Sequence, residues 1–408
     1  MNSAMVLPED QPLSMKITGQ TLRIKGRLDQ RAAELFYMIH VDEIRRLKFL
    51  NLSDVSRLYA DGFLPICARL LSMNKTLKIR CDNNAGVHRI LDFYGYRDLV
   101  TVGGLTDNLR IRQRIRQFTK EGETEPYIAA SFDEIERRVS CGRDVAEAFE
   151  WSIGELIGNV FHHSESKIGT LVQFLLQHQS ELVKFALVDT GIGLLATIQR
   201  AFPNVSTSQE AIQYAIRRGV TSNPENQGWG LFGSTELVRL SQGSFRLWTG
   251  DALLFIDPRG NYHYRAAPRF EGVAIEWQLP YRRDVDLKAA LQSRDVISVS
   301  LLRYEDPSSG ASLLKLQAES QSFTDRAIGR QIKNKLLNLI KSSPEGRCIV
   351  DFANVRVVSS SFADECFGKL AVRLQPNFSR HVSFRNMSAT NQAIVEAAVA
   401  ERLRVSPR

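Results

Sequence analysis

Three short motifs follow one another in the middle third of the chain, and their order constrains the fold more than any other feature. The first is a row of polar residues, Glu155, Asn159 and His163, spaced four residues apart. This spacing predicts one face of an α-helix, which we expect over 145–161. A carboxylate, a carboxamide and an imidazole in a row could hold a hydrated Mg²⁺ ion, because magnesium prefers oxygen ligands and keeps several waters. A half-polar surface helix would show the same pattern.

The second motif is Asp189-Thr-Gly191-Ile-Gly193, which directly follows the apolar segment 185–188. A carboxylate at the end of a buried strand can accept a hydrogen bond from the amino group of adenine. Glycines, which lack a Cβ atom, allow the backbone to approach a planar base closely. The motif alone is a moderate indication of a nucleotide site, since loops after strands are often rich in Asp and Gly.

The third motif is Gly228-Trp-Gly230-Leu231-Phe-Gly233, and a helical pattern over 234–240 follows it. Glycines at a helix N-terminus leave backbone N–H groups accessible to phosphate. A glycine-rich loop of this kind is common by itself, but the three motifs in this order and spacing are not. Together they indicate a nucleotide site.

In order and spacing the three motifs resemble those of the GHKL ATP-binding fold, which gyrase, Hsp90, histidine kinases, MutL and anti-sigma serine kinases share. The polar helical row resembles the N-box of that family, and the other two motifs resemble its first and second glycine boxes. The resemblance covers residues 110–281 and implies a Bergerat α/β sandwich that binds ATP and Mg²⁺.

The resemblance also implies a role for each motif residue. Asn159 would hold Mg²⁺, Glu155 would orient or deprotonate the attacking group, and Asp189 would bind adenine. The other residues expected to contact the nucleotide are His163, Gly191, Gly193, Gly228, Gly230, Leu231 and Gly233.

A lid is implied as well, and the sequence departs from the family at two positions. Residues 202–227 would form a flexible lid with its helix over 209–218. Val273, in the expected last strand, stands where the family usually has Thr, and Phe232 stands where many members have a third glycine. The second departure changes the phosphate loop locally and argues against fast catalysis.

Strands alternate with helices on both sides of the central block, which predicts a smaller α/β domain on each side. We therefore expect an α/β protein of three domains, at 14–104, 105–283 and 294–408. The expected strands are 15–24, 47–52, 76–81, 109–118, 171–177, 183–189, 245–248, 273–279, 297–302, 348–352 and 382–386. The expected helices outside the central block are 30–38, 62–71, 85–94, 325–339, 362–374 and 391–403.

Both outer blocks resemble STAS domains, the anti-anti-sigma fold. Residues 51–63 resemble the STAS strand-to-helix turn, and residues 351–362 resemble that of a STAS-like domain of unknown function. In STAS regulators this turn carries a serine that a GHKL serine kinase phosphorylates, which makes Ser360 and Ser361 candidate phosphoacceptors. A plain helix N-cap explains the same serines. The first block has Asp61 at this place, which could only mimic a fixed negative charge.

Composition excludes several other classes of protein. Lys and Arg outnumber Asp and Glu by 53 to 45, and the densest basic cluster alternates along 110–120, as on a solvated strand face, so we do not expect a nucleic-acid partner. The five cysteines form no CxxC pair, which argues against a disulfide framework and a zinc site. No signal peptide and no long apolar run is visible, so we expect a cytoplasmic protein without a membrane partner.

The fold alone does not decide among the activities of the family. Residues 122–143 are few and contain no His, which argues against a conventional histidine kinase. We expect an ATP-binding regulatory protein with a protein partner, either an anti-sigma-like serine kinase acting by partner switching or an ATP-driven conformational switch without a protein substrate. The second alternative would suit a homodimeric clamp. A non-catalytic ATP-binding scaffold is the third alternative.

Overall fold

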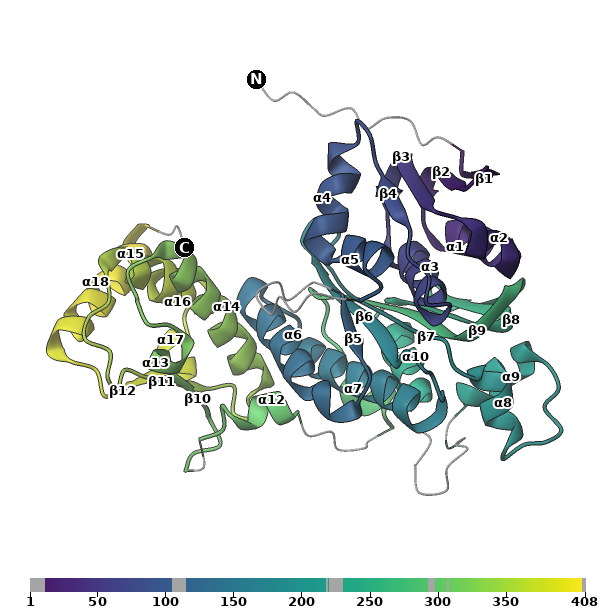
Figure 1. Cartoon of the computed structure of the whole chain (residues 1–408). Coiled ribbons are helices and arrows are strands. Elements are labelled where there is room, and N and C mark those ends of the chain that lie inside the picture. Colours follow the sequence, from purple (N-terminus) through teal and green to yellow (C-terminus); the bar gives the residue numbers. More distant parts are fainter. Residues whose placement is uncertain are drawn as a thin grey trace. The chain divides into compact units, whose positions relative to one another are not determined.

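The computed structural model describes residues 12–104, 115–217, 219, 230–292, 298–306 and 308–405 (Figure 1). It is a mixed α/β structure with a four-stranded, a five-stranded and a three-stranded sheet, which confirms the expected fold class. The chain forms two compact units, residues 1–128 with 152–280 and residues 129–151 with 281–408. The division into three domains stays a prediction. No helix in the described ranges is long and apolar enough to cross a membrane.

The first sheet lies in the N-terminal block. Its strands, in spatial order, are β1 (Ser14–Thr18), β2 (Thr21–Leu28), β3 (Phe49–Leu58) and β4 (Lys78–Arg80). β1 pairs antiparallel with β2, whereas β2, β3 and β4 are parallel neighbours. The expected single strand over 15–24 is therefore wrong. Gly19, with a φ of 58°, adopts the left-handed conformation of a tight turn and folds the segment into a hairpin.

Five helices accompany this sheet: α1 (Gln30–Met38), α2 (Val41–Arg46), α3 (Ala60–Ser72), α4 (Ala85–Tyr94) and α5 (Tyr96–Thr101). α1 and α4 have the predicted bounds, because a capping side chain precedes each of them. Asp29 accepts a hydrogen bond from the N–H of Arg31, and Asn84 accepts one from the N–H of Val87. The local sequence is therefore sufficient to define where these helices begin.

The second sheet is antiparallel throughout and forms the central block. Its strands, in spatial order, are β5 (Arg116–Phe118), β6 (Thr170–Gln177), β7 (Leu182–Asp189), β9 (Tyr262–Pro280) and β8 (Ser244–Ile256). β6 and β7 form the predicted hairpin. β8 and β9 are much longer than the expected strands over 245–248 and 273–279. Most of the expected strand over 109–118 lies outside the described residues.

The helices of this block include the one that carries the polar row. They are α6 (Glu125–Arg138), α7 (Val145–His163), α8 (Gly193–Gln199), α9 (Ser208–Ala215) and α10 (Gly230–Leu240), with a 3₁₀ turn, η1, at Glu121–Glu123. α7 confirms the helix expected over 145–161 and extends it by two residues. α9 lies within the expected lid, and it begins at a capping box of Thr207 and Glu210.

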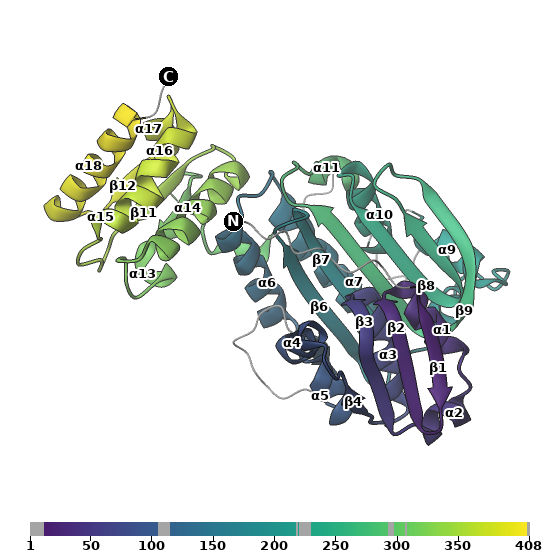
Figure 2. The same cartoon turned by 90° about the horizontal axis from the view of Figure 1, so that it is seen from above.

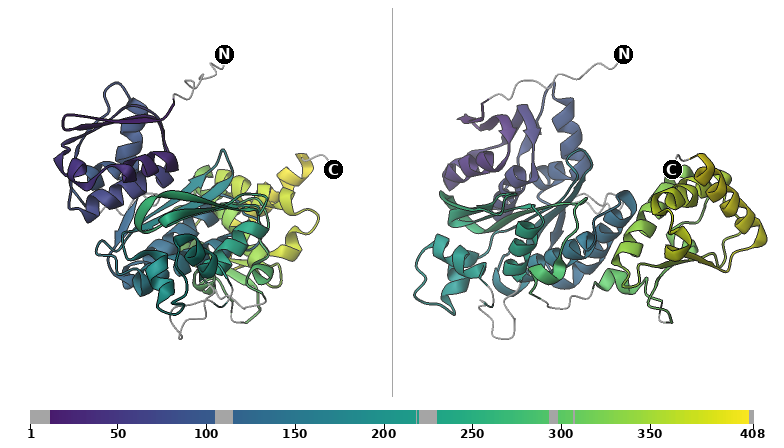
Figure 3. Two further views of the ribbon diagram at one scale, coloured as in Figure 1. Left: turned by 90° about the vertical axis from the view of Figure 1, so that its right-hand side faces the viewer. Right: turned by 180° about the vertical axis from the view of Figure 1, so that it is seen from behind.

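The N-terminal block packs against the central sheet and shares its hydrophobic core (Figures 2 and 3). Polar contacts join the same two layers: the Tyr96 hydroxyl donates to Gln173 Oε1 at 2.5 Å, and Arg265 pairs with Glu34. The shared apolar core includes Phe36, Phe63, Leu171, Ala186, Val188, Trp248, Phe270 and Ala274. The N-terminal block is thus one layer of the same compact unit as the central sheet.

The third sheet is parallel, with β10 (Ser312–Lys315), β11 (Cys348–Asp351) and β12 (Val382–Arg385) in that order. The second unit also contains α11 (Leu287–Ala290), α12 (Val299–Leu302), α13 (Leu316–Glu319), α14 (Arg326–Ser342), α15 (Ser360–Ala363), the π-helix η2 (Asp364–Gly368), α16 (Lys369–Leu374), α17 (Phe378–His381) and α18 (Ala389–Val405). The predicted strands over 348–352 and 382–386 are thus confirmed as β11 and β12.

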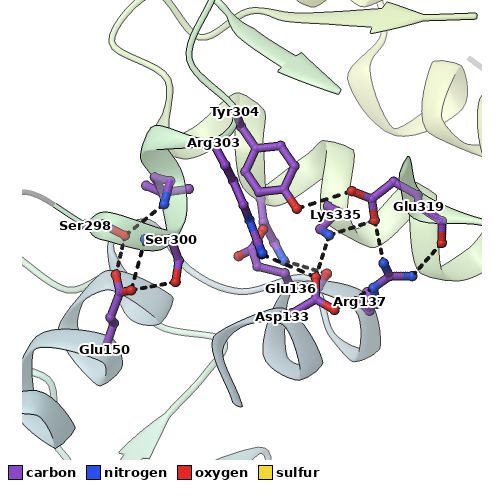
Figure 4. A network of polar contacts seen from close by, with 12 residues as sticks. Asp133, Glu136, Arg137, Glu150, Ser298, Ser300, Arg303, Tyr304, Glu319 and Lys335 are labelled. Atoms are coloured by element: carbon purple, nitrogen blue, oxygen red, sulfur yellow. Dashed lines mark hydrogen bonds and ion pairs between the residues drawn. The ribbon is translucent and has the colours of Figure 1, made fainter. Parts of the chain in front are cut away.

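The expected strand over 297–302 is wrong, because its described residues form α12. The Ser298 hydroxyl accepts a hydrogen bond from the N–H of Leu301, as a helix N-cap does. Glu150 of α7 accepts from Ser298 and from the N–H and hydroxyl of Ser300 (Figure 4). A carboxylate about 150 residues away in sequence thus stabilises the helix N-terminus, and a short sequence window contains no sign of it.

A buried ion network joins α6 to α14 in this second unit (Figure 4). The Lys335 side chain is fully buried, and its Nζ lies 2.6 Å from Asp133 Oδ1 and 2.8 Å from Glu319 Oε2. Arg137 pairs with the same two carboxylates. Burial opposes the ionisation of Asp133, but the cations, Lys335 first among them, outweigh it and lower its pKa to about 2.

We predict that Lys335→Met lowers the free energy of unfolding by about 3 kcal/mol, because it removes one partner from a buried ion network. Chemical denaturation of the full chain measures this, with the exposed Lys315→Met as control. Because the folded pKa of Asp133 is lower than the unfolded value of 3.8, the difference from the parent should be full above pH 4. It should shrink as the pH falls toward 2. Equal stability of Lys335→Met and Lys315→Met would contradict this role.

Candidate functional site

The polar row on α7 faces the beginning of α10. Glu155 and Asn159 are half-buried on α7. A Cβ atom added at Gly230 would lie 2.6 Å from Glu155 Oε2 and 3.2 Å from Asn159 Nδ2. The backbone of Gly230 therefore lies directly against these two side chains, and the second glycine motif brings a helix N-terminus against a carboxylate and a carboxamide. These residues belong to two of the three motifs predicted to form the nucleotide site.

Asp189 lies at the end of β7 with 1% of its surface exposed. Its Oδ1 accepts a hydrogen bond from the N–H of Gly191 at 2.8 Å, and the carboxylate also accepts one from the N–H of Val273. Burial raises the pKa of Asp189 to about 7, although both backbone hydrogen bonds oppose the shift. A buried acceptor with this geometry suits the amino group of a purine.

The loop after Asp189 is packed too tightly for any side chain at its glycines. A Cβ at Gly191 would lie 1.9 Å from the carbonyl oxygen of Ser164, and Gly193 has a φ of 75°. On the neighbouring strand, Gly272 has a φ of 101°, and its Cβ would lie 2.3 Å from the carbonyl oxygen of Asp189. The N–H of Ile192 donates to Ser164 at 2.8 Å, which connects the loop to the end of α7.

The remaining predicted nucleotide contacts are only partly within the structure. His163 is the last residue of α7, and burial first, then its neighbours His162 and Arg200, lower its pKa. Leu231 is half-buried and Gly233 is buried in α10. Gly228 lies outside the described residues, as do residues 218 and 220–227 of the expected lid.

The site suits a magnesium ion only if water molecules and phosphate oxygens supply most of the ligands of that ion. Within the described residues no cluster of three or more His, Cys, Asp or Glu side chains could hold a metal ion. A single carboxamide such as that of Asn159 is enough when phosphate oxygens and waters complete the coordination shell. The residues present therefore fit a nucleotide-bound Mg²⁺ and not a protein-enclosed metal.

The three serines at the start of α15 have different environments. The Ser359 hydroxyl accepts a hydrogen bond from the N–H of Phe362 and donates to the carbonyl of Thr324, so Ser359 is the N-cap. Ser360 and Ser361 are exposed. In the part of the chain that the structure describes, their hydroxyls make no hydrogen bond. The cap explanation therefore accounts for Ser359 but not for the other two.

Asp61 does not present a charge to a partner. Its side chain is 8% exposed, and its Oδ2 lies 2.5 Å from Arg246 Nη1, which also pairs with Glu276. Burial, followed by the charge of Glu276, raises the pKa of Asp61 to about 7. The side chain holds the N-terminal layer to the central sheet instead of mimicking a phosphate on the surface.

One residue at the site, Thr249, could not be predicted from the local sequence. Thr249 lies in β8, about 60 residues after Asp189, and contacts the glycine loop through its hydroxyl. The threonine expected from the family would lie at position 273, where this chain has valine. Only the pairing of β8 with β9 brings Thr249 to the loop.

The comparisons with known proteins bear on the C-terminal block. The family model of a STAS-like domain of unknown function (DUF4325) matches residues 328–392, which include Ser360 and Ser361. No GHKL family model matches the central block, and no curated protein matches the chain. The chain therefore contains a STAS-like domain within its C-terminal block.

Proposed function

We propose that this protein binds ATP with Mg²⁺ in a GHKL-type site and acts as a nucleotide-dependent regulator. The observation that carries the proposal is the contact of the α10 N-terminus with Glu155 and Asn159, within the same unit as the buried acceptor Asp189. Asp189 would accept a hydrogen bond from the adenine amino group. The backbone N–H groups at the start of α10 would bind phosphate.

The remaining roles follow from the chemistry of the side chains. Asn159 would hold Mg²⁺, which neutralises phosphate charge when it is bound. Glu155 would orient or deprotonate the group that attacks the terminal phosphate. Because Asp189 is buried at the end of a strand, whereas Glu155 is half-buried on α7 beside Gly230, we assign Asp189 to binding and Glu155 to catalysis.

We propose serine kinase activity as the first candidate reaction. It is favoured by the STAS-like domain in the same chain and by the exposed hydroxyls of Ser360 and Ser361. An ATP-driven conformational switch is the second candidate, and it is favoured by the packing of the N-terminal layer on the strands of the site. Transfer of label from γ-labelled ATP to protein serine separates the two.

Asp189→Asn should weaken ATP binding by about 10- to 100-fold, because a charged acceptor for the amino group is lost. ATP and Mg²⁺ should raise the melting temperature of the parent, and the rise should be much smaller in the variant. Asp82→Asn, at an exposed loop position, serves as the control. An unchanged melting temperature of the parent at saturating ATP would refute the proposed function itself.

Binding of the base should depend on pH because the acceptor must be ionised. The pKa of Asp189 is about 7 in the free protein, so the affinity for adenosine should be constant above pH 8. It should fall by about tenfold for each pH unit below 7. Adenosine is the probe because it has no phosphate that titrates in this range. A pH-independent affinity between 5.5 and 8 would show that the carboxylate form is not required.

Glu155→Ala should retain ATP binding and lose turnover, since the group that positions or deprotonates the nucleophile is absent. Asn159→Ala should instead weaken the Mg²⁺-dependent part of binding. Release of labelled phosphate and phosphoserine mapping on the full chain measure ATP hydrolysis and serine phosphorylation, with Ser360→Ala/Ser361→Ala as the acceptor control. Parent-like turnover in Glu155→Ala would remove this residue from its assigned role.

A further inference from the structure

The Thr249 hydroxyl connects two segments that meet at the candidate adenine site. Thr249 is 1% exposed, and its Oγ1 accepts a hydrogen bond from the N–H of Leu194 at 3.2 Å. The same hydroxyl donates to the carbonyl of Gly272 at 2.7 Å. Both hydrogen-bonding capacities of one buried hydroxyl are thus used between β8, the glycine loop and β9.

Both of these segments also hold the carboxylate of Asp189. Gly191, three residues before Leu194, donates to Asp189 Oδ1, and Val273, next to Gly272, donates to the same carboxylate. Thr249 therefore connects the two backbone segments that orient the acceptor. An added Cβ at Gly193 would lie 3.0 Å from Thr249 Oγ1, so the hydroxyl packs directly on the loop.

The neighbouring residue on β8 holds Thr249 in position. Trp248 is 1% exposed, and its ring lies 5.1 Å from that of Tyr37 and 4.7 Å from that of Phe270, measured between centroids. Its indole N–H donates to the carbonyl of Pro268 at 3.0 Å. Trp248 thus packs on the N-terminal layer, whereas the hydroxyl of Thr249 contacts the glycine loop after Asp189.

We propose that Thr249 is a positioning residue that sets the preference of this site for adenine over guanine, an inference that rests on the proposed function. Adenine presents an amino donor at purine position 6, whereas guanine presents a carbonyl acceptor there. A carboxylate fixed opposite this position accepts from adenine and repels guanine. The hydrogen bonds of Thr249 keep Asp189 and its two backbone donors in the arrangement that makes this distinction.

The test compares Thr249→Val, which keeps the shape and loses both hydrogen bonds, with Thr249→Ser, which keeps the hydroxyl. Affinities of the full chain for ATP and GTP are measured by calorimetry at pH 8, where Asp189 is ionised. We expect Thr249→Val to bind ATP about tenfold more weakly, and the ratio of ATP to GTP affinity to fall by a similar factor. Thr249→Ser should restore both to within about threefold of the parent.

The outcomes distinguish a positioning role of Thr249 from a purely structural role. They also distinguish a failure of this inference from a failure of the proposed function. If the Thr249→Val variant melts at a lower temperature but keeps the parent ratio of ATP to GTP affinity, the residue is merely structural and the inference is wrong. Parent-like ATP affinity in Thr249→Val would also overturn it. If the parent binds neither nucleotide, the proposed function fails first, and this inference fails with it.

Discussion

The candidate site depends on one buried carboxylate at the end of a strand. Asp189 is removed from water, and among the described residues the backbone N–H groups of Gly191 and Val273 oppose the cost of burying its charge. A carboxylate that is costly to bury and incompletely compensated is poised to accept another donor. The backbone around Asp189 adopts this arrangement with glycines at 191 and 193 in the loop and at 272 on the neighbouring strand.

The N-terminal layer gives this site a rigid support. Val188, which precedes Asp189, and Trp248, which precedes Thr249, both belong to the core shared with the N-terminal block. Arg246 and Asp61 pair across the same junction. The first block thus stabilises the central sheet, whereas the C-terminal STAS-like domain has exposed serines at the start of α15.

Local patterns in the sequence were enough for the elements and residues that depend on short-range rules. The spacing of Glu155 and Asn159 predicts the helix α7, and capping residues explain why the bounds of α1 and α4 agree with the predicted ones. Contacts between residues far apart in sequence determine the features that were not predicted. Glu150 determines that α12 is a helix, and the pairing of β8 with β9 brings Thr249 to the loop. No short window of sequence contains those partners.

Hydrogen–deuterium exchange of the full chain, with and without ATP and Mg²⁺, tests the central claim most directly. The account predicts slower exchange of the backbone amides over 189–194 and at the start of α10, around Gly230, when ATP is present. The exposed hairpin end at 257–261 should not change and serves as the internal reference. Identical exchange at 189–194 and around Gly230 with saturating ATP would contradict a nucleotide site at Asp189.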